Sequence, residues 1–269
     1  MKYLHSLLLI TALCMASSTY ATQIVAHRGA SFDAPENTLS SFKLGYENKA
    51  DADELDIHLT NDGKVVVMHD YDTGRTGGVK KKVVDQTLEE LRQQDIGKWG
   101  KWKDKGFSEK IPLLQEVLAL IPDGKRLFIE IKCGPEILPE LARVLHEGGK
   151  KPEQTIIIGF GYETMKAAKK KFPNLEVAWL VEADKQTKKY APVEELIQKA
   201  RSAGLDALDV NKGFPIDKDF VDKVHQAGLK LYTWTVDDVA VARAEAEAGV
   251  DGITTNRAGW LREQLAAKP

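Results

Sequence analysis

The sequence predicts an α/β fold, a (β/α)8 TIM barrel with a small insertion after its second strand. Short runs suited to strands alternate with charged segments suited to helices from residue 24 onward. This alternation is typical of parallel sheets. Eight such strand runs within about 250 residues fit a closed barrel better than an open sheet.

The elements follow one another regularly along the chain. The predicted strands cover residues 24–26, 53–59, 127–131, 155–159, 177–180, 207–210, 229–233 and 252–254. The predicted helices lie between most of them, at residues 38–47, 113–121, 135–147, 163–171, 193–203, 217–227 and 236–248.

One further strand, at residues 65–68, breaks this order. It follows the second strand after only Asn61, Asp62, Gly63 and Lys64. A crossover to a parallel strand needs a dozen or more residues, so this run is expected to return antiparallel in a hairpin. The return would bring His69 back towards Asp56.

Residues 70–110 fit no barrel element and are interpreted as an insertion or lid between the second strand and its helix. They are rich in Gly, Lys and Asp, and a short helix is predicted at residues 87–94. Trp99 and Trp102 lie within this segment. Packing inside the insertion is the favoured role for both, and contact with a lipid-like substrate is the alternative.

The first residues resemble a secretory signal peptide. Lys2 precedes an apolar run, and small residues lead to an expected cleavage after Ala21. A lipoprotein anchor at Cys14 is the less favoured interpretation, because Leu13 stands where a small residue is usual. We expect an exported protein, periplasmic or secreted, with residues 22–269 forming a single domain. No later apolar run is long enough for a membrane span.

Charge and cysteine content exclude some classes of partner and bond. The formal net charge is −2, which gives no indication of nucleic-acid binding. Beyond the predicted signal only Cys133 remains, so an internal disulfide is excluded. We expect Cys133 to be a small packing residue rather than a reactive thiol.

Three carboxylates are predicted to meet inside the barrel. Side chains alternate along a strand, so Glu54 and Asp56 share the inward face, and Glu130 and Lys132 do so on the next barrel strand. Oxygen donors of this kind suit Mg²⁺ or Ca²⁺. The alternative is a salt-bridged cluster closed by Lys132 and Arg28. His58 has the same parity but lies farther along the hairpin.

Two histidines, His27 and His69, each follow a predicted strand. Their imidazoles can exchange protons near neutral pH, as a reaction with one proton acceptor and one proton donor requires. Arg28 offers a fork that matches phosphate, and Lys132 offers a point charge. Gly29 lets the backbone turn tightly.

In these motifs the chain resembles the glycerophosphodiester phosphodiesterase family from Ile24 to about Asn256. The segments that carry the resemblance are Ala26-His27-Arg28-Gly29-Ala30, Pro35-Glu36-Asn37-Thr38, Glu54-Leu55-Asp56 with Thr60-Asn61-Asp62-Gly63, Val66-Val67-Met68-His69-Asp70, Ile111 to Val117, Ile129-Glu130-Ile131-Lys132, Thr233-Trp234-Thr235-Val236 and Gly249 to Asn256. The resemblance implies a TIM barrel with an insertion after the His-Asp motif.

It also implies a metal-dependent hydrolase that cleaves a small-molecule glycerophosphodiester to an alcohol and sn-glycerol 3-phosphate, with one divalent cation, Mg²⁺ or Ca²⁺. The implied metal ligands are Glu54, Asp56 and Glu130, and the acid/base pair is His27 and His69. Arg28 and Lys132 are implied on the phosphate, Glu36 beside His27, and Trp234 as an apolar wall for the glycerol.

Two functions remain as alternatives. One is a lipid phosphodiesterase of the lysophospholipase D kind, and the other is a non-catalytic barrel that binds glycerophosphate. The chain departs from the family pattern at Thr73-Gly74-Arg75-Thr76-Gly77 and lacks a proline near Arg257 and Ala258. Both departures concern substrate specificity rather than the catalytic groups.

Overall fold

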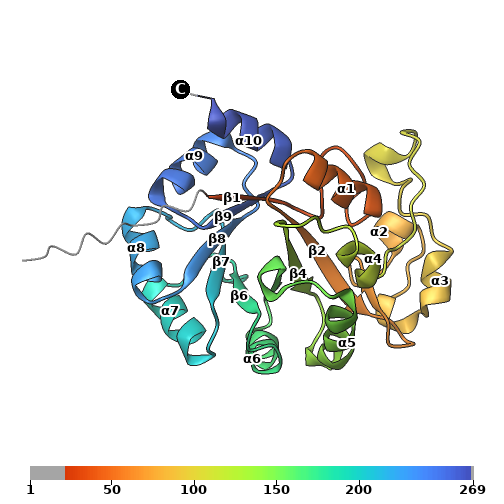
Figure 1. Cartoon of the computed structure of the whole chain (residues 1–269), viewed down its shortest axis with the longest axis horizontal. Coiled ribbons are helices and arrows are strands. Elements are labelled where there is room, and N and C mark those ends of the chain that lie inside the picture. The colour runs from red at the N-terminus through yellow and green to blue at the C-terminus, as the bar shows by residue number, and fades with distance from the viewer. Residues whose placement is uncertain (1–21, 268–269) are drawn as a thin grey trace, which may run out of the picture.

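The structure, a computed structural model, describes residues 22–267 and shows the predicted barrel (Figure 1). The predicted signal peptide lies outside the described residues. Eight parallel strands form the barrel: β1 (Gln23–Ala26), β2 (Ala52–Leu59), β4 (Arg126–Ile131), β5 (Thr155–Gly159), β6 (Glu176–Val181), β7 (Ala207–Asn211), β8 (Lys230–Trp234) and β9 (Gly252–Thr255). β1 pairs with both β9 and β2, which closes the ring.

Helices surround the strands, as Figure 1 shows. They are α1 (Leu39–Glu47), α4 (Leu114–Leu118), α5 (Leu138–Gly148), α6 (Tyr162–Lys171), α7 (Val193–Ser202), α8 (Lys218–Gln226), α9 (Val239–Ala248) and α10 (Ala258–Ala266), with short 3₁₀ turns η3 (Pro135–Ile137) and η4 (Pro152–Gln154). The sequence pattern did not predict α10. This helix begins after Arg257 without a side-chain cap, so the usual start signal is missing.

The two faces of the strands have the predicted polarity. Leu55 and Ile57 of β2 face outward and join the large core beneath the helices. The inward face carries a smaller apolar cluster, in which Phe128 and Tyr232 meet edge-to-face with centroids 5.1 Å apart. The barrel is therefore filled by apolar side chains below the level of its acidic residues.

The hairpin and the insertion are also present. β3 (Val65–Val67) runs antiparallel to β2, with Ile57 opposite Val67. The insertion follows and contains α2 (Gly74–Gly77), η1 (Val83–Asp85), α3 (Leu88–Arg92) and η2 (Gly100–Trp102). It lies at one side of the barrel beside α1 and α4 (Figure 1).

The insertion has its own small core. Its buried apolar residues are Val66, Met68, Val83, Leu91, Ile96 and Ile111. Trp102 is 6% exposed and packs edge-on against Phe107. Trp99 lies under the guanidinium of Arg75, and Arg75 Cζ is 4.9 Å from the centroid of the Trp99 ring. Trp102 is therefore buried within the insertion, whereas Trp99 is half-buried and its partner Arg75 is partly exposed.

No helix among residues 22–267 is both long and apolar enough to cross a membrane. Cys133 is a half-buried free thiol that packs against the core beneath the helices. Burial raises the pKa of this thiol to about 11, which fits a packing role.

Candidate active site

The predicted site residues meet at the carboxyl ends of the barrel strands. A cavity of about 970 Å³ opens there and is lined by His27, Arg28, Glu54, His69, Glu130, Lys132 and Trp234. Functional residues of (β/α)8 barrels usually occupy this end, where the loops that follow the strands converge. Asp56 and Glu36 are not among the lining residues, but Asp56 pairs with Arg28 and Lys132, and Glu36 pairs with Arg28.

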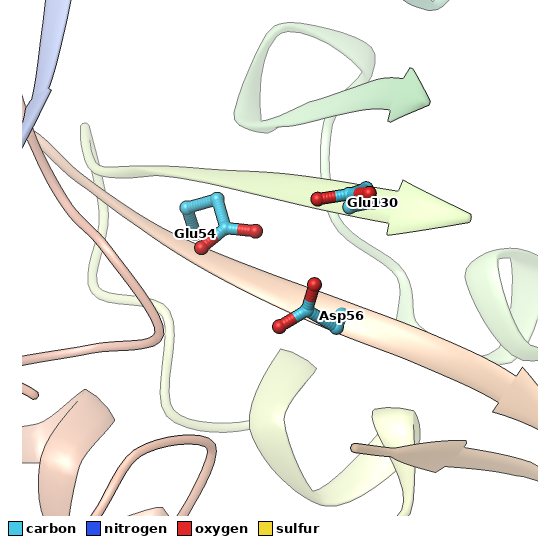
Figure 2. A group of neighbouring side chains, drawn as sticks. All are labelled: Glu54, Asp56 and Glu130. Atoms are coloured by element: carbon cyan, nitrogen blue, oxygen red, sulfur yellow. The ribbon is translucent and has the colours of Figure 1, made fainter. Parts of the chain in front are cut away.

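Three carboxylates form the floor of the site. Glu54 and Asp56 extend from β2, and Glu130 extends from β4 into the same space (Figure 2). One oxygen of each lies within 4.8 Å of the others, and all three side chains are buried. Their approach follows from the strand register, which places Asp56 beside Glu130.

The crowding of these carboxylates disturbs their ionisation. Burial, together with the neighbouring carboxylates of Asp56 and Glu130, raises the pKa of Glu54 well above its usual value. Burial and Asp56 raise the pKa of Glu130 to about 7. Burial acts in the same direction on Asp56, but the charges of Arg28 and Lys132 outweigh it and lower the pKa of that group.

Both predicted cations reach the cluster. Lys132 Nζ lies 2.8 Å from Glu130 Oε1 and 3.4 Å from Asp56 Oδ1, and Arg28 Nε lies 3.5 Å from Asp56 Oδ2. Part of the salt-bridged alternative is therefore present. Two cations nevertheless face three carboxylates, and the buried Asp56 Oδ1 accepts no hydrogen bond from the described residues. This oxygen-rich, incompletely neutralised set fits a hard divalent cation.

His27 is held by a neutral amide. Its Nδ1 lies 2.7 Å from Asn256 Oδ1, while Asn256 Nδ2 donates a hydrogen bond of 2.7 Å to Asp237 Oδ2. The second bond orients the amide, so Nδ1 of His27 is the donor and its Nε2 carries the lone pair. Burial and the adjacent charge of Arg28 lower the pKa of His27 to about 4.

His69 is held by a carboxylate instead. Its Nδ1 lies 2.7 Å from Asp70 Oδ1. Burial would raise the pKa of Asp70, but hydrogen bonds from Arg75 and His69 outweigh it and hold the pKa at about 2. His58 is buried below this loop, with Nε2 3.3 Å from the carbonyl of His69, and is not a member of the carboxylate cluster.

Arg28 has an unusual backbone conformation. Its φ is +54°, which costs a residue with a side chain about 1–2 kcal/mol. Its N–H donates to Glu54 Oε2 at 2.9 Å, and its carbonyl accepts from Ser41 Oγ at 3.0 Å. These bonds fix the turn after β1, and the side chain reaches Glu36 Oε1 at 3.0 Å.

The structure adds residues for which the sequence analysis predicted no role. Asn37 donates to Asp56 Oδ2 at 2.8 Å, and Asn256 and Asp237 hold His27 as described. Asn37 and Asn256 fall within segments that resemble the family, a signal that could have found them. Asp237 contacts Asn256, and Arg75 contacts Glu36. Both contacts join segments that are distant in the sequence, so no local sequence pattern predicts them. Asp209 of β7 also lines the cavity.

Comparison with known proteins identifies the family. A family model described as the glycerophosphoryl diester phosphodiesterase family matches residues 27–259. The chain belongs to this family. It is 36% identical to a glycerophosphodiester phosphodiesterase of Caldanaerobacter subterraneus subsp. tengcongensis over 87% of this chain and 94% of that protein. A glycerophosphodiester phosphodiesterase of Bacillus subtilis is 34% identical over 86% of this chain and 82% of its own length.

Solved structures show the same fold. A phosphodiesterase of Oleispira antarctica, in complex with the product sn-glycerol-3-phosphate, has a TM-score of 0.80 at 25% identity and covers 92% of this chain and 98% of its own. The glycerophosphodiester phosphodiesterase of Thermotoga maritima has a TM-score of 0.72 at 26% identity, covering 91% of this chain and 98% of its own. The chain is therefore a phosphodiesterase with the fold of its family. The alternative of a non-catalytic barrel that binds glycerophosphate is set aside.

Proposed function

We propose that the enzyme hydrolyses glycerophosphodiesters to an alcohol and sn-glycerol 3-phosphate, with a divalent cation bound by Glu54, Asp56 and Glu130. The observation that carries the proposal is the meeting of three buried carboxylates with two histidines and two cationic side chains at one barrel mouth. The relatives named for this activity support it, as does the neighbour that binds the product.

Mg²⁺ or Ca²⁺ suits the oxygen ligands equally, and such an ion would supply Lewis-acid polarisation of a phosphoryl oxygen when bound. Arg28 and Lys132 bring positive charge beside the carboxylate cluster. In this role both side chains would bind phosphate oxygens and stabilise the charge that develops during transfer. Trp234, which packs edge-to-face on Phe160 at 5.4 Å, forms an apolar wall beside them.

The hydrogen-bond partners of the histidines favour different roles for the two rings. His27 donates from Nδ1 to Asn256, so its free Nε2 can accept the proton of the attacking oxygen. His69 donates from Nδ1 to the carboxylate of Asp70, and a carboxylate in that position stabilises a ring that carries positive charge. His69 is thereby suited to protonate the leaving alcohol.

Hydrolysis of glycerophosphocholine, followed by release of glycerol 3-phosphate, tests the proposal. We expect activity to vanish in a chelator and to return with Mg²⁺ or Ca²⁺, and Glu54→Gln to remove it. Glu245→Gln is the matched control, because Glu245 is equally buried but bonds to Thr233 on the helix side of the barrel. Full activity of Glu54→Gln, or of the chelated enzyme, would contradict the metal role.

The lipid phosphodiesterase alternative depends on exposed tryptophans in the insertion, whereas Trp102 is buried and Trp99 is half-buried beneath Arg75. A glycerophosphodiester in solution is therefore the favoured substrate. Vesicle binding that is lost in Trp99→Ala would reverse this preference.

We further propose that the enzyme acts outside the cytoplasm, as the signal-like residues 1–21 suggest. Mass spectrometry of the protein recovered from the periplasm or the medium should give a chain beginning at Thr22. Recovery of the full-length chain from the cytoplasm alone would oppose export.

A further inference from the structure

Arg75 of α2 bonds to two carboxylates at once. Its Nε and one terminal nitrogen donate to the two oxygens of Asp70 at 2.6 and 3.0 Å. Its terminal nitrogens also donate to the two oxygens of Glu36, at 3.0 and 2.7 Å. One edge of the planar guanidinium thus donates to Asp70 and another edge donates to Glu36. No other side chain can reproduce this arrangement.

Each of these carboxylates holds a residue of the proposed site. Asp70 accepts from Nδ1 of His69, and Glu36 accepts from the guanidinium of Arg28 at 3.0 Å. A continuous chain of hydrogen bonds therefore runs from His69 through Asp70, Arg75 and Glu36 to Arg28. It joins the loop after β1 to the loop after β3, which are otherwise separate segments of the barrel mouth.

Both carboxylates are held in their charged form. The pKa of Asp70 is about 2, as described above. Burial would raise the pKa of Glu36, but the hydrogen bond from Arg75 and the charge of Arg28 outweigh it and lower that pKa. Arg75 is itself held in place from its other face, because it stacks over the ring of Trp99.

We propose that Arg75 is a positioning residue that fixes His69 and Arg28 relative to one another. By holding Asp70 and Glu36 together, it sets the proton donor for the leaving alcohol and the phosphate-binding guanidinium at one distance and orientation. The insertion thereby supplies a part of the active site rather than only a cover. The inference rests on the proposed function, since it assigns His69 to the leaving group.

Two substrates with different leaving groups test this role in Arg75→Gln. Choline leaves glycerophosphocholine only with a proton, whereas 4-nitrophenolate leaves the corresponding nitrophenyl diester without one. We expect kcat to fall about 10- to 100-fold on glycerophosphocholine, the usual effect of a misplaced catalytic group. On the nitrophenyl diester kcat should change less than about threefold, while KM rises for both substrates because Arg28 loses its support.

Arg75→Lys and Arg143→Gln complete the experiment. Lysine keeps the charge but cannot donate two hydrogen bonds to each of the two carboxylates. We therefore expect an intermediate loss of kcat on glycerophosphocholine. Arg75→Lys also replaces Arg75→Gln in the experiment if Arg75→Gln folds poorly. Arg143 likewise joins two carboxylates, Glu140 and Glu147, but on the exposed face of α5, and its variant should behave as wild type.

Equal loss of kcat on both substrates would show that Arg75 is only structural, and wild-type kinetics would show that it has no role; either result overturns the inference. Failure of the wild-type enzyme to hydrolyse glycerophosphocholine would instead contradict the proposed function, so the two failures are distinguishable.

Discussion

At the scale of single residues, the two histidines differ in what holds them. Asn256 is neutral and is itself fixed by Asp237, whereas Asp70 is charged and is fixed by Arg75. Rings of the same type thus face one cavity with different hydrogen-bond partners. In the function proposed above, these side chains behind the rings would make one histidine the base and the other the acid.

We expect His27→Ala and His69→Ala each to lower kcat about 10²- to 10⁴-fold, the usual contribution of a positioned acid or base. The loss in His69→Ala should be much smaller on the nitrophenyl diester, and the loss in His27→Ala should be similar on both substrates. Steady-state kinetics on the two substrates measures this. His146→Ala, on the exposed side of α5, is the control; near-normal turnover of either site variant would refute the assignment.

The raised pKa of Cys133 gives a pH prediction. A thiol with a pKa of about 11 holds little thiolate at pH 8, and the thiolate is the reactive form. Reaction with a disulfide reagent at pH 8 should therefore be about 100-fold slower in the folded protein than in guanidinium. The rate should rise with each pH unit up to about 11. Cys133→Ala gives the background, and fast labelling of the folded protein at pH 8 would refute the packing role.

At the scale of elements, the turns after β1 and β2 decide which side chains reach the site. The β2–β3 turn is closed by Thr60, whose Oγ1 accepts from the N–H of Lys64 at 2.8 Å, and by Gly63 at φ +71°. The turn after β1 uses Arg28 and Gly29, both at positive φ. The β2–β3 turn returns His69 to the barrel mouth, and the turn after β1 directs Arg28 towards Asp56.

Gly29→Ala is predicted to be strongly destabilising. A Cβ at this position would lie 2.5 Å from Ser41 Oγ and 2.8 Å from the backbone nitrogen of Phe42, at φ +75°. Strain and overpacking together should cost about 2–5 kcal/mol of unfolding free energy, measured in guanidinium.

Gly228→Ala is the matched control. It also has a positive φ, of +78°, but nothing lies within 4 Å of the added carbon. It should cost only about 1–2 kcal/mol of unfolding free energy. Equal losses in the two variants would show that the close approach of α1 to the turn after β1 is unimportant.

At the scale of the whole molecule, closure of the barrel assembles the site. The pairing of β1 with β2 brings the first strand, with His27 and Arg28 at its end, beside the acidic strand. The pairing of β2 with β4 adds Glu130 from a segment more than 70 residues later in the sequence. The site therefore depends on the intact barrel and not on any one segment.

A cation that neutralises the carboxylate cluster should stabilise the whole fold. At a concentration 100 times its Kd, a ligand of the folded state adds about 2.7 kcal/mol, or about 5 to 10 °C in Tm for a chain of this size. Thermal unfolding with and without Ca²⁺ or Mg²⁺ measures the shift. It should disappear in Asp56→Asn and persist in Glu245→Gln. A shift that survives in Asp56→Asn would place the ion elsewhere.

The sequence by itself determined the barrel, the hairpin and the identity of the main polar groups. Strand periodicity puts Glu54 and Asp56 on one face whatever the rest of the chain does, and the short turn at residues 61–64 permits only an antiparallel return. The helix α10 was missed because its start carries no capping signal. The strand face and the direction of the hairpin are properties of local geometry, which neighbouring residues determine.

Only the tertiary structure decided how the groups are partnered. Three sets of contacts link segments far apart in the chain: Arg75 joins Asp70 to Glu36, Asn256 and Asp237 support His27, and Arg28 and Lys132 pair with Asp56. Hydrogen bonds and charge balance depend on distances through space, which no sequence spacing encodes. For this reason the sequence could name two histidines for proton transfer, whereas only the folded structure shows that an amide holds one ring and a carboxylate holds the other.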